Sequence, residues 1–152
     1  MGQAEVVGPL DQAVGYALKR AATALRTAME AVLRPLDLTV PQYSCLEVLS
    51  QQPGLSNAEL ARAVFVTRQS MNLVLRGLQD RGLVSRPATA AHGRALPTEL
   101  TDAGRTQLQA ASAAVRSVEK RMLAPFSATR QNQLLRDLAA CAEALGPEPL
   151  PS

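Results

Sequence analysis

The sequence contains few of the residues on which many functional sites depend. It has one histidine, two cysteines and no tryptophan, and only 3% of its residues are aromatic. So few aromatic residues disfavour a stacking platform for single-stranded nucleic acid. Neither cysteine belongs to a CxxC pair or a Cys/His cluster, so no metal site and no cofactor are expected. A nucleophile–base constellation and a phosphate-binding loop are also lacking, which makes an enzyme a remote alternative.

Long apolar runs are lacking too. No stretch approaches the roughly 18 consecutive apolar residues of a transmembrane helix, so we expect no membrane partner and a cytoplasmic protein with reduced thiols. The 152 residues, of which 47% are hydrophobic, suffice for one sizeable core. Alanine and leucine are abundant whereas Val/Ile/Thr-rich runs are scarce, so the chain is predicted to be mainly helical.

The most informative segment runs from residue 56 to residue 94. It opens with Ser56-Asn57-Ala58-Glu59, a capping box that starts a short amphipathic helix. Thr67 is a second N-cap, from which a longer helix extends through Leu78. Phe65 occupies the turn between the two helices, where many helix-turn-helix motifs have glycine, so a slightly different turn is expected.

A two-stranded wing is predicted after Gly82, with strands over residues 83–86 and 94–100. Pro97 in the return strand implies an exposed edge. Two helices followed by this hairpin indicate a winged helix-turn-helix. Positive charge is concentrated in the same segment, because Asp80 is the only acid between Ala61 and Arg94, against Arg62, Arg68, Arg76, Arg81, Arg86 and Arg94. A local basic footprint on this motif is typical of a protein that binds double-stranded DNA.

Amphipathic helices are predicted on both sides of the winged segment. Apolar residues recur at spacings of three and four over residues 11–36, after Thr101-Asp102, and in a last helix that starts at Ser127 or Thr129. These helices carry more apolar surface than a monomer of this shape can bury, so we expect a homodimer. The predicted dimer contacts are Val14, Leu18, Val118, Leu134, Leu138, Cys141 and Leu145.

The predicted domain organisation follows from these elements. Residues 1–36 and 102–146 form a helical dimerisation domain, and residues 37–101 form the winged helix-turn-helix domain. Residues 147–152 are a proline-rich tail.

Four motifs stand in order along the chain: LTVPQY at residues 38–43, SNAELA at 56–61, GLVSR at 82–86 and LTDAGR at 100–105. Together they closely resemble the multiple-antibiotic-resistance regulator (MarR) family, over residues 10–145. The resemblance implies a dimeric winged-helix repressor that binds a pseudo-palindromic operator. It also implies release of the DNA when a small phenolic or aromatic acid binds between the DNA-binding lobe and the dimer helices.

The recognition helix implied by the resemblance starts at Thr67. Arg68 and Asn72 suit bidentate contacts to guanine and adenine, whereas Arg62, Arg76 and Arg86 suit phosphate contacts. The complete set of predicted DNA contacts is Ser56, Arg62, Thr67, Arg68, Gln69, Ser70, Asn72, Arg76, Arg86, His92 and Arg94. The alternative is a solvated polar face on a core helix.

The wing departs from the family pattern at one position. Arg94 matches the wing-tip arginine that enters the minor groove in the family. His92 stands where the family usually has an aspartate that pairs with this arginine and orients it. The orienting carboxylate is therefore missing, although the positive charge remains.

A ligand site is predicted from an aromatic ring beside cations. Tyr16, Lys19 and Arg20 lie one helical turn apart on the first helix, and Tyr43 lies early on the second. Such a set beside an apolar cavity suits an aromatic carboxylate of the salicylate type. The candidate ligand residues are Tyr16, Lys19, Arg20, Tyr43 and Leu46; the alternative is ordinary surface charge and core packing.

Two further alternatives concern mechanism. Cys45 is predicted to fill the core, and its alternative is a cysteine redox switch. The chain could also be a winged-helix protein-interaction module that does not touch DNA. That module predicts an acidic or neutral recognition face, which Arg68 and Arg76 contradict.

Overall fold

The computed structural model of the chain describes residues 8–86 and 97–146. Within these residues it contains six α-helices, two short 3-10 helices and one two-stranded antiparallel sheet, which confirms the predicted mainly helical, winged helix-turn-helix fold. In chain order the elements are η1 (Leu10–Gln12), α1 (Val14–Leu33), η2 (Arg34–Leu36), α2 (Val40–Gln51), α3 (Asn57–Ala63), α4 (Arg68–Asp80), β1 (Val84–Ser85), β2 (Glu99–Leu100), α5 (Asp102–Leu123) and α6 (Ala128–Leu145).

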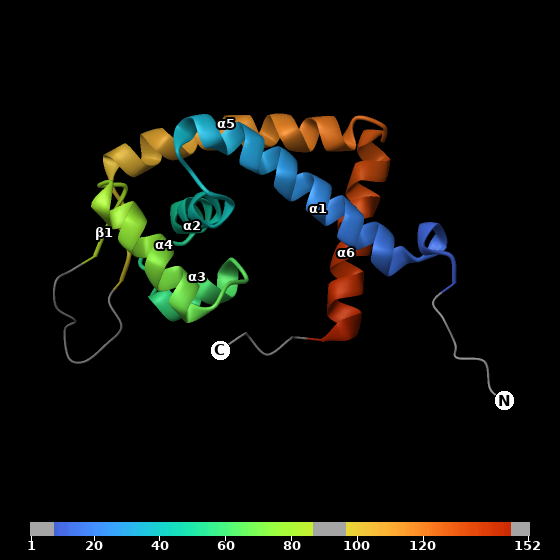
Figure 1. Cartoon of the computed structure of the whole chain (residues 1–152), viewed down its shortest axis with the longest axis horizontal. Helices are drawn as coiled ribbons and strands as arrows, with labels where there is room; N and C mark the ends of the chain where they lie inside the picture. The colour runs from blue at the N-terminus through green and yellow to red at the C-terminus, as the bar shows by residue number, and fades with distance from the viewer. Residues whose placement is uncertain (1–7, 87–96, 147–152) are drawn as a thin grey trace.

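The elements divide into a compact head and a frame of long helices (Figure 1). Helices α2, α3 and α4 form the head, with β1 and β2 at its edge. Helix α1 packs against α5 above the head, and α2 packs against the underside of α5. Helix α6 turns away from the end of α5 and runs down the side opposite α4.

Local capping explains where the helices begin. The Thr39 hydroxyl accepts a hydrogen bond from the Gln42 amide at 3.2 Å, and the Gln42 side chain accepts one from the Thr39 amide at 3.0 Å. The Thr101 hydroxyl accepts from the Gly104 amide at the start of α5, and the Ser127 hydroxyl accepts from the Arg130 amide at the start of α6. Each hydroxyl satisfies an amide that has no partner inside its helix. The predicted starts of α5 after Thr101 and of α6 at Ser127 are confirmed.

One continuous core joins the head to the frame. Leu33 of α1, Leu46 of α2, Leu75 of α4 and Ala111 of α5 are all fully buried in a single cluster. The division into a dimerisation domain (1–36 and 102–146) and a DNA-binding domain (37–101) therefore stays a prediction, since this packing does not separate the two parts.

The first predicted helix was too long. Instead of one helix over residues 11–36, the chain forms η1, then α1, then η2. Ala13 has an extended backbone (ψ 117°), which separates η1 from α1 and leaves Asp11 outside α1. Pro35 has no amide hydrogen for a helical bond, so α1 ends at Leu33 and continues only as the 3-10 turn η2.

The described part of the wing is shorter than predicted. Only Val84 and Ser85 pair with Leu100 and Glu99, whereas strands over residues 83–86 and 94–100 were expected. Residues 94–96 lie outside the described residues. Thr98 bonds instead to the loop before α3: its amide donates to the Leu55 carbonyl at 3.0 Å, and its carbonyl accepts from Gly54 at 3.0 Å. The return strand therefore pairs with Leu55 at Thr98, directly after Pro97, and with β1 at Glu99 and Leu100.

The terminal helices leave apolar side chains exposed. None of the α6 residues is buried, and Leu138 and Leu145 are 44% and 86% exposed. On α1, Val14 is 79% exposed and Leu18 47%. Leu134 is half-buried, and Cys141 is exposed. These six predicted dimer residues have surface available for a second copy.

Val118 is the exception among the predicted dimer contacts. Its side chain is only 4% exposed in the single chain, because the face of α5 on which it lies is already covered. The prediction that Val118 contacts a partner is corrected to a place in the packing of one chain.

Candidate nucleic-acid interface

Two side-chain caps start the helices of the candidate interface. The Ser56 hydroxyl accepts a hydrogen bond from the Glu59 amide at 3.2 Å, and the Ser56 amide donates to the Glu59 carboxylate at 3.2 Å. The hydrogen bonds from Ser56 lower the pKa of the Glu59 carboxyl. Thr67 caps α4 by accepting from the Ser70 amide at 3.0 Å. Both predicted caps are confirmed, and they fix where α3 and α4 begin.

Helix α4 has one face in the core and one in solvent. Met71, Leu75 and Leu78 are fully buried, which fixes the rotation of the helix about its axis. The exposed side chains up to Arg76 are Arg68, Gln69, Ser70, Asn72, Leu73 and Arg76, and Gln79 and Asp80 are exposed at the C-terminal end of the helix. A rigid helix therefore presents five polar candidate contacts together with one leucine that is 68% exposed.

Asn57 contacts Asn72 across the two helices. The Nδ2 amide of Asn57, the first residue of α3, donates a hydrogen bond to Oδ1 of Asn72. Asn72 then still has its own amide group to donate, so its side chain is oriented before any DNA arrives. Analysis of the sequence missed this function of Asn57, because only its place beside the Ser56 cap is visible there.

The turn between α3 and α4 confirms the predicted departure from the usual shape. Phe65 has a φ of 61°, in the left-handed region, and its side chain is 84% exposed. The Val66 amide donates to the Ala61 carbonyl at 3.1 Å and closes the turn. Glycine adopts this backbone readily and phenylalanine does not, so the turn is strained.

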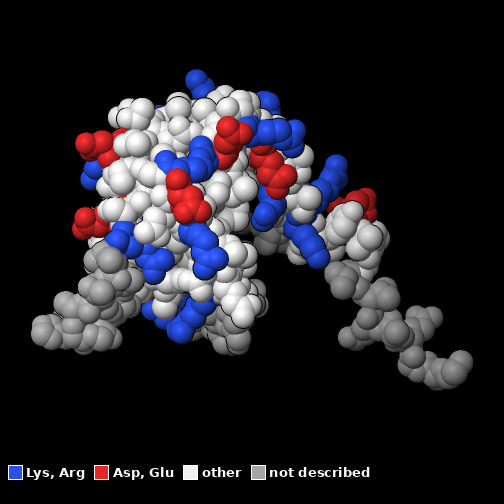
Figure 2. All heavy atoms as spheres, turned by 60° about the vertical axis from the view of Figure 1, so that its left-hand side comes forward, with Lys and Arg blue, Asp and Glu red and all other residues white. Residues whose placement is uncertain are grey.

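The other predicted DNA contacts occupy different environments. Arg62 is exposed on α3, and Arg86 is half-buried just after β1. Ser56 is 9% exposed with its hydroxyl engaged in the cap, so its predicted DNA contact is corrected to a structural function. His92 and Arg94 lie outside the described residues. Figure 2 shows Lys and Arg side chains at the lower end of the head.

One arginine of the basic segment has partners inside the chain. Arg81, the C-cap of α4, donates to the carbonyls of Leu36 and Asp37 at the end of η2. Since these partners are 45 and 44 residues away, no sequence spacing could have indicated the contact.

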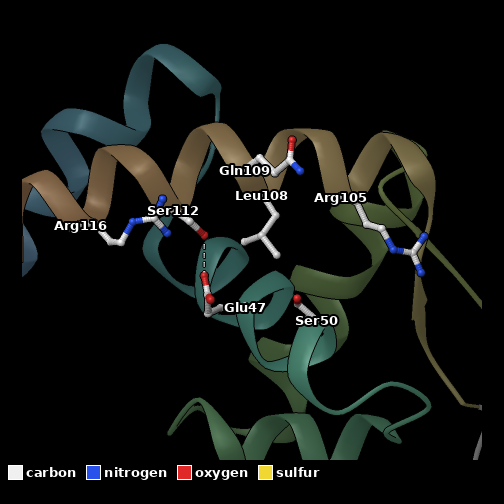
Figure 3. Close-up of a pocket in the computed structure, with 7 residues that line it drawn as sticks. All are labelled: Glu47, Ser50, Arg105, Leu108, Gln109, Ser112 and Arg116. Carbon is white, nitrogen blue, oxygen red and sulfur yellow. Dashed lines mark hydrogen bonds between the residues drawn. The ribbon is translucent and has the colours of Figure 1, made fainter.

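A cavity of about 320 Å³ lies between α2 and α5 (Figure 3). Ser112 of α5 donates to the Glu47 carboxylate of α2 at 2.7 Å across it. Arg105 lies at one end, where it pairs with Asp102 at 3.3 Å, and Arg116 lies at the other. The complete lining is Glu47, Ser50, Arg105, Leu108, Gln109, Ser112 and Arg116. None of these residues was predicted to bind a ligand.

Tyr43 borders the same pair of helices but is buried. Burial, together with the neighbouring Glu47, raises the pKa of Tyr43 to about 12, so the phenol stays protonated and can donate a hydrogen bond. Leu46 is fully buried in the core. These two predicted ligand residues therefore pack in the hydrophobic core of the chain.

The other predicted ligand residues lie along α1. An open groove of about 570 Å³ has Tyr16 and Arg20 in its lining, with Leu10, Asp11 and three alanines of α1, whereas Lys19 is exposed nearby on the helix. Tyr43 and Leu46 are not in that lining. The structure of one chain thus divides the predicted ligand residues into an α1 group and a core group.

The two cysteines differ in environment. Cys45 is fully buried, and burial raises the pKa of its thiol to about 12, so the reactive thiolate is suppressed. Its predicted place in the core is confirmed, and this burial argues against a redox switch at Cys45. Cys141 is exposed on α6.

Two negative findings apply to residues 8–86 and 97–146. Within them no three His, Cys, Asp or Glu side chains gather into a group that could hold a metal ion. No helix among them combines the length and the apolar character needed to cross a membrane.

Comparison with known proteins gives consistent matches. A sequence model described as MarR family matches residues 36–95. The HTH-type transcriptional repressor Rv2887 of Mycobacterium tuberculosis is 48% identical over 128 residues, which cover 84% of this chain and 92% of the relative. The crystal structure of Rv2887 with salicylic acid has a TM-score of 0.70 at 47% identity, covering 85% of this chain and 96% of that one. Its complex with DNA has a TM-score of 0.71 at 45% identity, covering 88% and 98%.

Proposed function

This chain belongs to the MarR family of transcriptional regulators, and we propose that it is a homodimeric repressor that binds double-stranded DNA. Proteins of this family are regulators and not enzymes.

The exposed face of α4 carries the proposal. The polar side chains of this face are exposed, and three fully buried residues on the opposite face of α4 fix the rotation of the helix. Rv2887, a relative of this chain, has been crystallised with DNA. With this helix in the major groove, Arg68 and Asn72 read base edges, and Asn72 is held in position by Asn57. Gln69, Ser70 and the Thr67 cap lie at the end of the helix that enters first.

Backbone contacts complete the interface. Arg62, Arg76 and Arg86 neutralise phosphates and set the register of the head without reading sequence. His92 and Arg94 are proposed to contact DNA from the wing, with Arg94 in the minor groove. We leave Ser56 out of the interface, because its hydroxyl caps α3.

Two copies are proposed to pair through the terminal helices. The exposed apolar residues of α1 and α6, among them Leu18, Leu138 and Leu145, would be covered by the partner. The two recognition helices then enter successive major grooves of a pseudo-palindromic operator, with half-sites roughly 10 bp apart. Leu138→Lys would place a charge in that interface, and sedimentation velocity should show monomers at concentrations where the wild type is dimeric.

A small aromatic acid is proposed as the releasing ligand. The relative Rv2887 has been crystallised with salicylic acid. Here Tyr16, Lys19 and Arg20 offer a ring and two cations on exposed α1, and the partner's helices would close the groove over them. Tyr43 and Leu46 would form the wall behind the ligand only if the core opened. The acid must bind the released state of the dimer more tightly than the DNA-bound state, since otherwise it shifts nothing.

Selection of bound DNA tests the proposal. Genomic fragments enriched by the wild-type protein yield an operator, whose affinity is then measured by fluorescence anisotropy for wild type, Arg68→Ala and Asn72→Ala. Each variant should lose about 1–3 kcal/mol of binding free energy and discriminate less at one base pair. Gln51→Ala, a loss of an exposed amide at the end of α2, is the matched control. Failure to enrich any DNA, or wild-type binding by both variants, overturns the proposal.

Salicylate titration of the DNA complex tests the ligand. Release of DNA by salicylate, weakened in Arg20→Ala, is the expected result. If no acid in a panel of hydroxybenzoates releases the DNA, the α1 groove is ordinary protein surface.

A further inference from the structure

The corner between α1 and α2 is held by side chains from two distant helices. This corner consists of η2 and Asp37, whose φ of 54° lies in the left-handed region. Arg81 donates through Nη1 to the Asp37 carbonyl and through Nη2 to the Leu36 carbonyl at 3.3 Å. Gln107 of α5 donates to the same Leu36 carbonyl at 2.8 Å. We call these three contacts the corner clamp.

The chemistry of the clamp suits arginine. Carbonyls at the end of a helical turn have no partners within the turn and carry partial negative charge. The planar guanidinium presents several N–H groups in a fixed fork, so it can bond two successive carbonyls at once. Lysine has only one nitrogen and cannot reproduce that fork. The carbonyls of Leu36 and of the left-handed Asp37 both accept from the same guanidinium.

The position of Arg81 in the chain makes the clamp a mechanical link. Arg81 directly follows the last residue of the recognition helix α4, and η2 directly follows the last residue of α1. In Figure 1 the end of α1 lies above the head, on the same side as the end of α4 beside β1. The clamp therefore ties the helix that reads DNA to a helix proposed to pair with the second copy.

Arg81 is poorly placed to touch DNA itself. Both of its terminal nitrogens are engaged with carbonyls. It also lies at the opposite end of α4 from Thr67 and Arg68, and a 13-residue helix separates its ends by about 20 Å.

We propose that Arg81 is a positioning residue that fixes the angle between the recognition helix α4 and the dimer helix α1. In a dimer this angle sets the distance between the two heads, and thus the half-site spacing that the protein accepts. Gln107 supports the same corner from α5. The inference rests on the proposed function, because spacing has meaning only for two DNA-binding heads.

Operators of altered spacing test the inference. The operator selected by the wild-type protein is rebuilt with one base pair added or removed between the half-sites. Arg81→Ala should bind the original operator on the order of tenfold more weakly and should discriminate less among the three spacings. Arg81→Lys keeps the charge but loses the fork, so its discrimination should also fall. Gln107→Ala removes only the second donor to Leu36 and should show a smaller loss in the same direction.

Salt dependence separates positioning from phosphate contact. The slope of log affinity against log salt should be unchanged in Arg81→Ala, whereas Arg76→Ala should reduce it by about one. Arg121→Ala, which removes an exposed arginine from the last turn of α5, controls for the loss of net charge.

The spacing and salt experiments together distinguish a positioning function of Arg81 from a phosphate contact. Unchanged spacing discrimination in Arg81→Ala and Arg81→Lys overturns the inference, as does a slope reduced by one with discrimination intact, since that identifies a phosphate contact. If Arg81→Ala does not fold, Arg81→Lys and Gln107→Ala give the decisive comparison. A wild-type protein that binds no DNA refutes the proposed function instead, which is a different result.

Discussion

Gly104 should be one of the least replaceable residues of the fold. It is the third residue of α5 and buried, and a Cβ built there would lie 2.0 Å from the Leu83 carbonyl oxygen and 3.0 Å from the carbonyl carbon. Normal carbon–oxygen contacts are about 3.3 Å or longer, so α5 and the segment before β1 would have to separate by more than about 1 Å. The obstacle is backbone, which cannot rotate away as a side chain does.

The cost of Gly104→Ala follows from the contacts that this separation breaks. Overpacking of this kind costs about 1–3 kcal/mol. The Leu83 carbonyl also accepts the Thr101 amide at 3.1 Å, and losing that bond costs about 1 kcal/mol. Alanine is intrinsically better than glycine in a helix by about 1 kcal/mol, which offsets part of the loss. The net destabilisation expected is about 1–3 kcal/mol.

Urea unfolding followed by circular dichroism at 222 nm measures this value at a fixed protein concentration. Gly15→Ala is the matched control, because a Cβ at Gly15 of α1 meets nothing within 4 Å, and it should stabilise the protein by up to about 1 kcal/mol. The two substitutions should therefore change stability with opposite signs. Equal stabilisation by both would show that the close approach of α5 to Leu83 is not a constraint.

Three further predictions concern buried or strained side chains. Iodoacetamide at pH 8 should leave Cys45 unmodified in the folded protein, because burial raises its pKa to about 12; mass spectrometry that finds an adduct at Cys45 without denaturant would contradict this. Stability should fall as the pH rises from about 9 to 12, since across that window the unfolded thiol loses its proton while the folded thiol keeps it, and the fall should be shallower in Cys45→Ala. Phe65→Gly should raise the free energy of unfolding by about 0.5–1 kcal/mol, because glycine relieves the left-handed backbone, and a less stable variant would show that the exposed ring makes a stabilising contact.

Local signals allowed most of the fold to be predicted from the sequence. A Ser or Thr followed three residues later by Glu or Gln marks a helix start through contacts within four residues, and the predicted box at Ser56 is confirmed; Thr39 and Gln42 form the same box at the start of α2. The buried face of α4 follows from 3.6-residue periodicity. Thr67 could be predicted as a cap because its contact with the Ser70 amide is also local, and the exposed face of α4 could be predicted because it lies opposite the periodic apolar face.

Contacts between distant segments could not be predicted in this way. Arg81 reads in sequence as one more arginine of a basic segment, yet its partners lie on η2. Periodicity identified Val118 as apolar and inward, but it cannot tell whether an apolar face meets its own chain or a second copy. The bridge between Leu55 and Thr98 likewise depends on how the loop before α3 folds back.

The distribution of buried residues along the chain sets an order of events during synthesis. Every buried side chain of the described residues falls between Ala13 and Val118, and α6 contributes none. At about 5–20 residues per second, the ribosome needs roughly 1–5 s to add residues 119–145, up to the end of α6. All core residues have been made before α6 exists, so the head can fold in a step that does not depend on protein concentration. The proposed pairing through α6 would come afterwards and would be second order in the newly made chain.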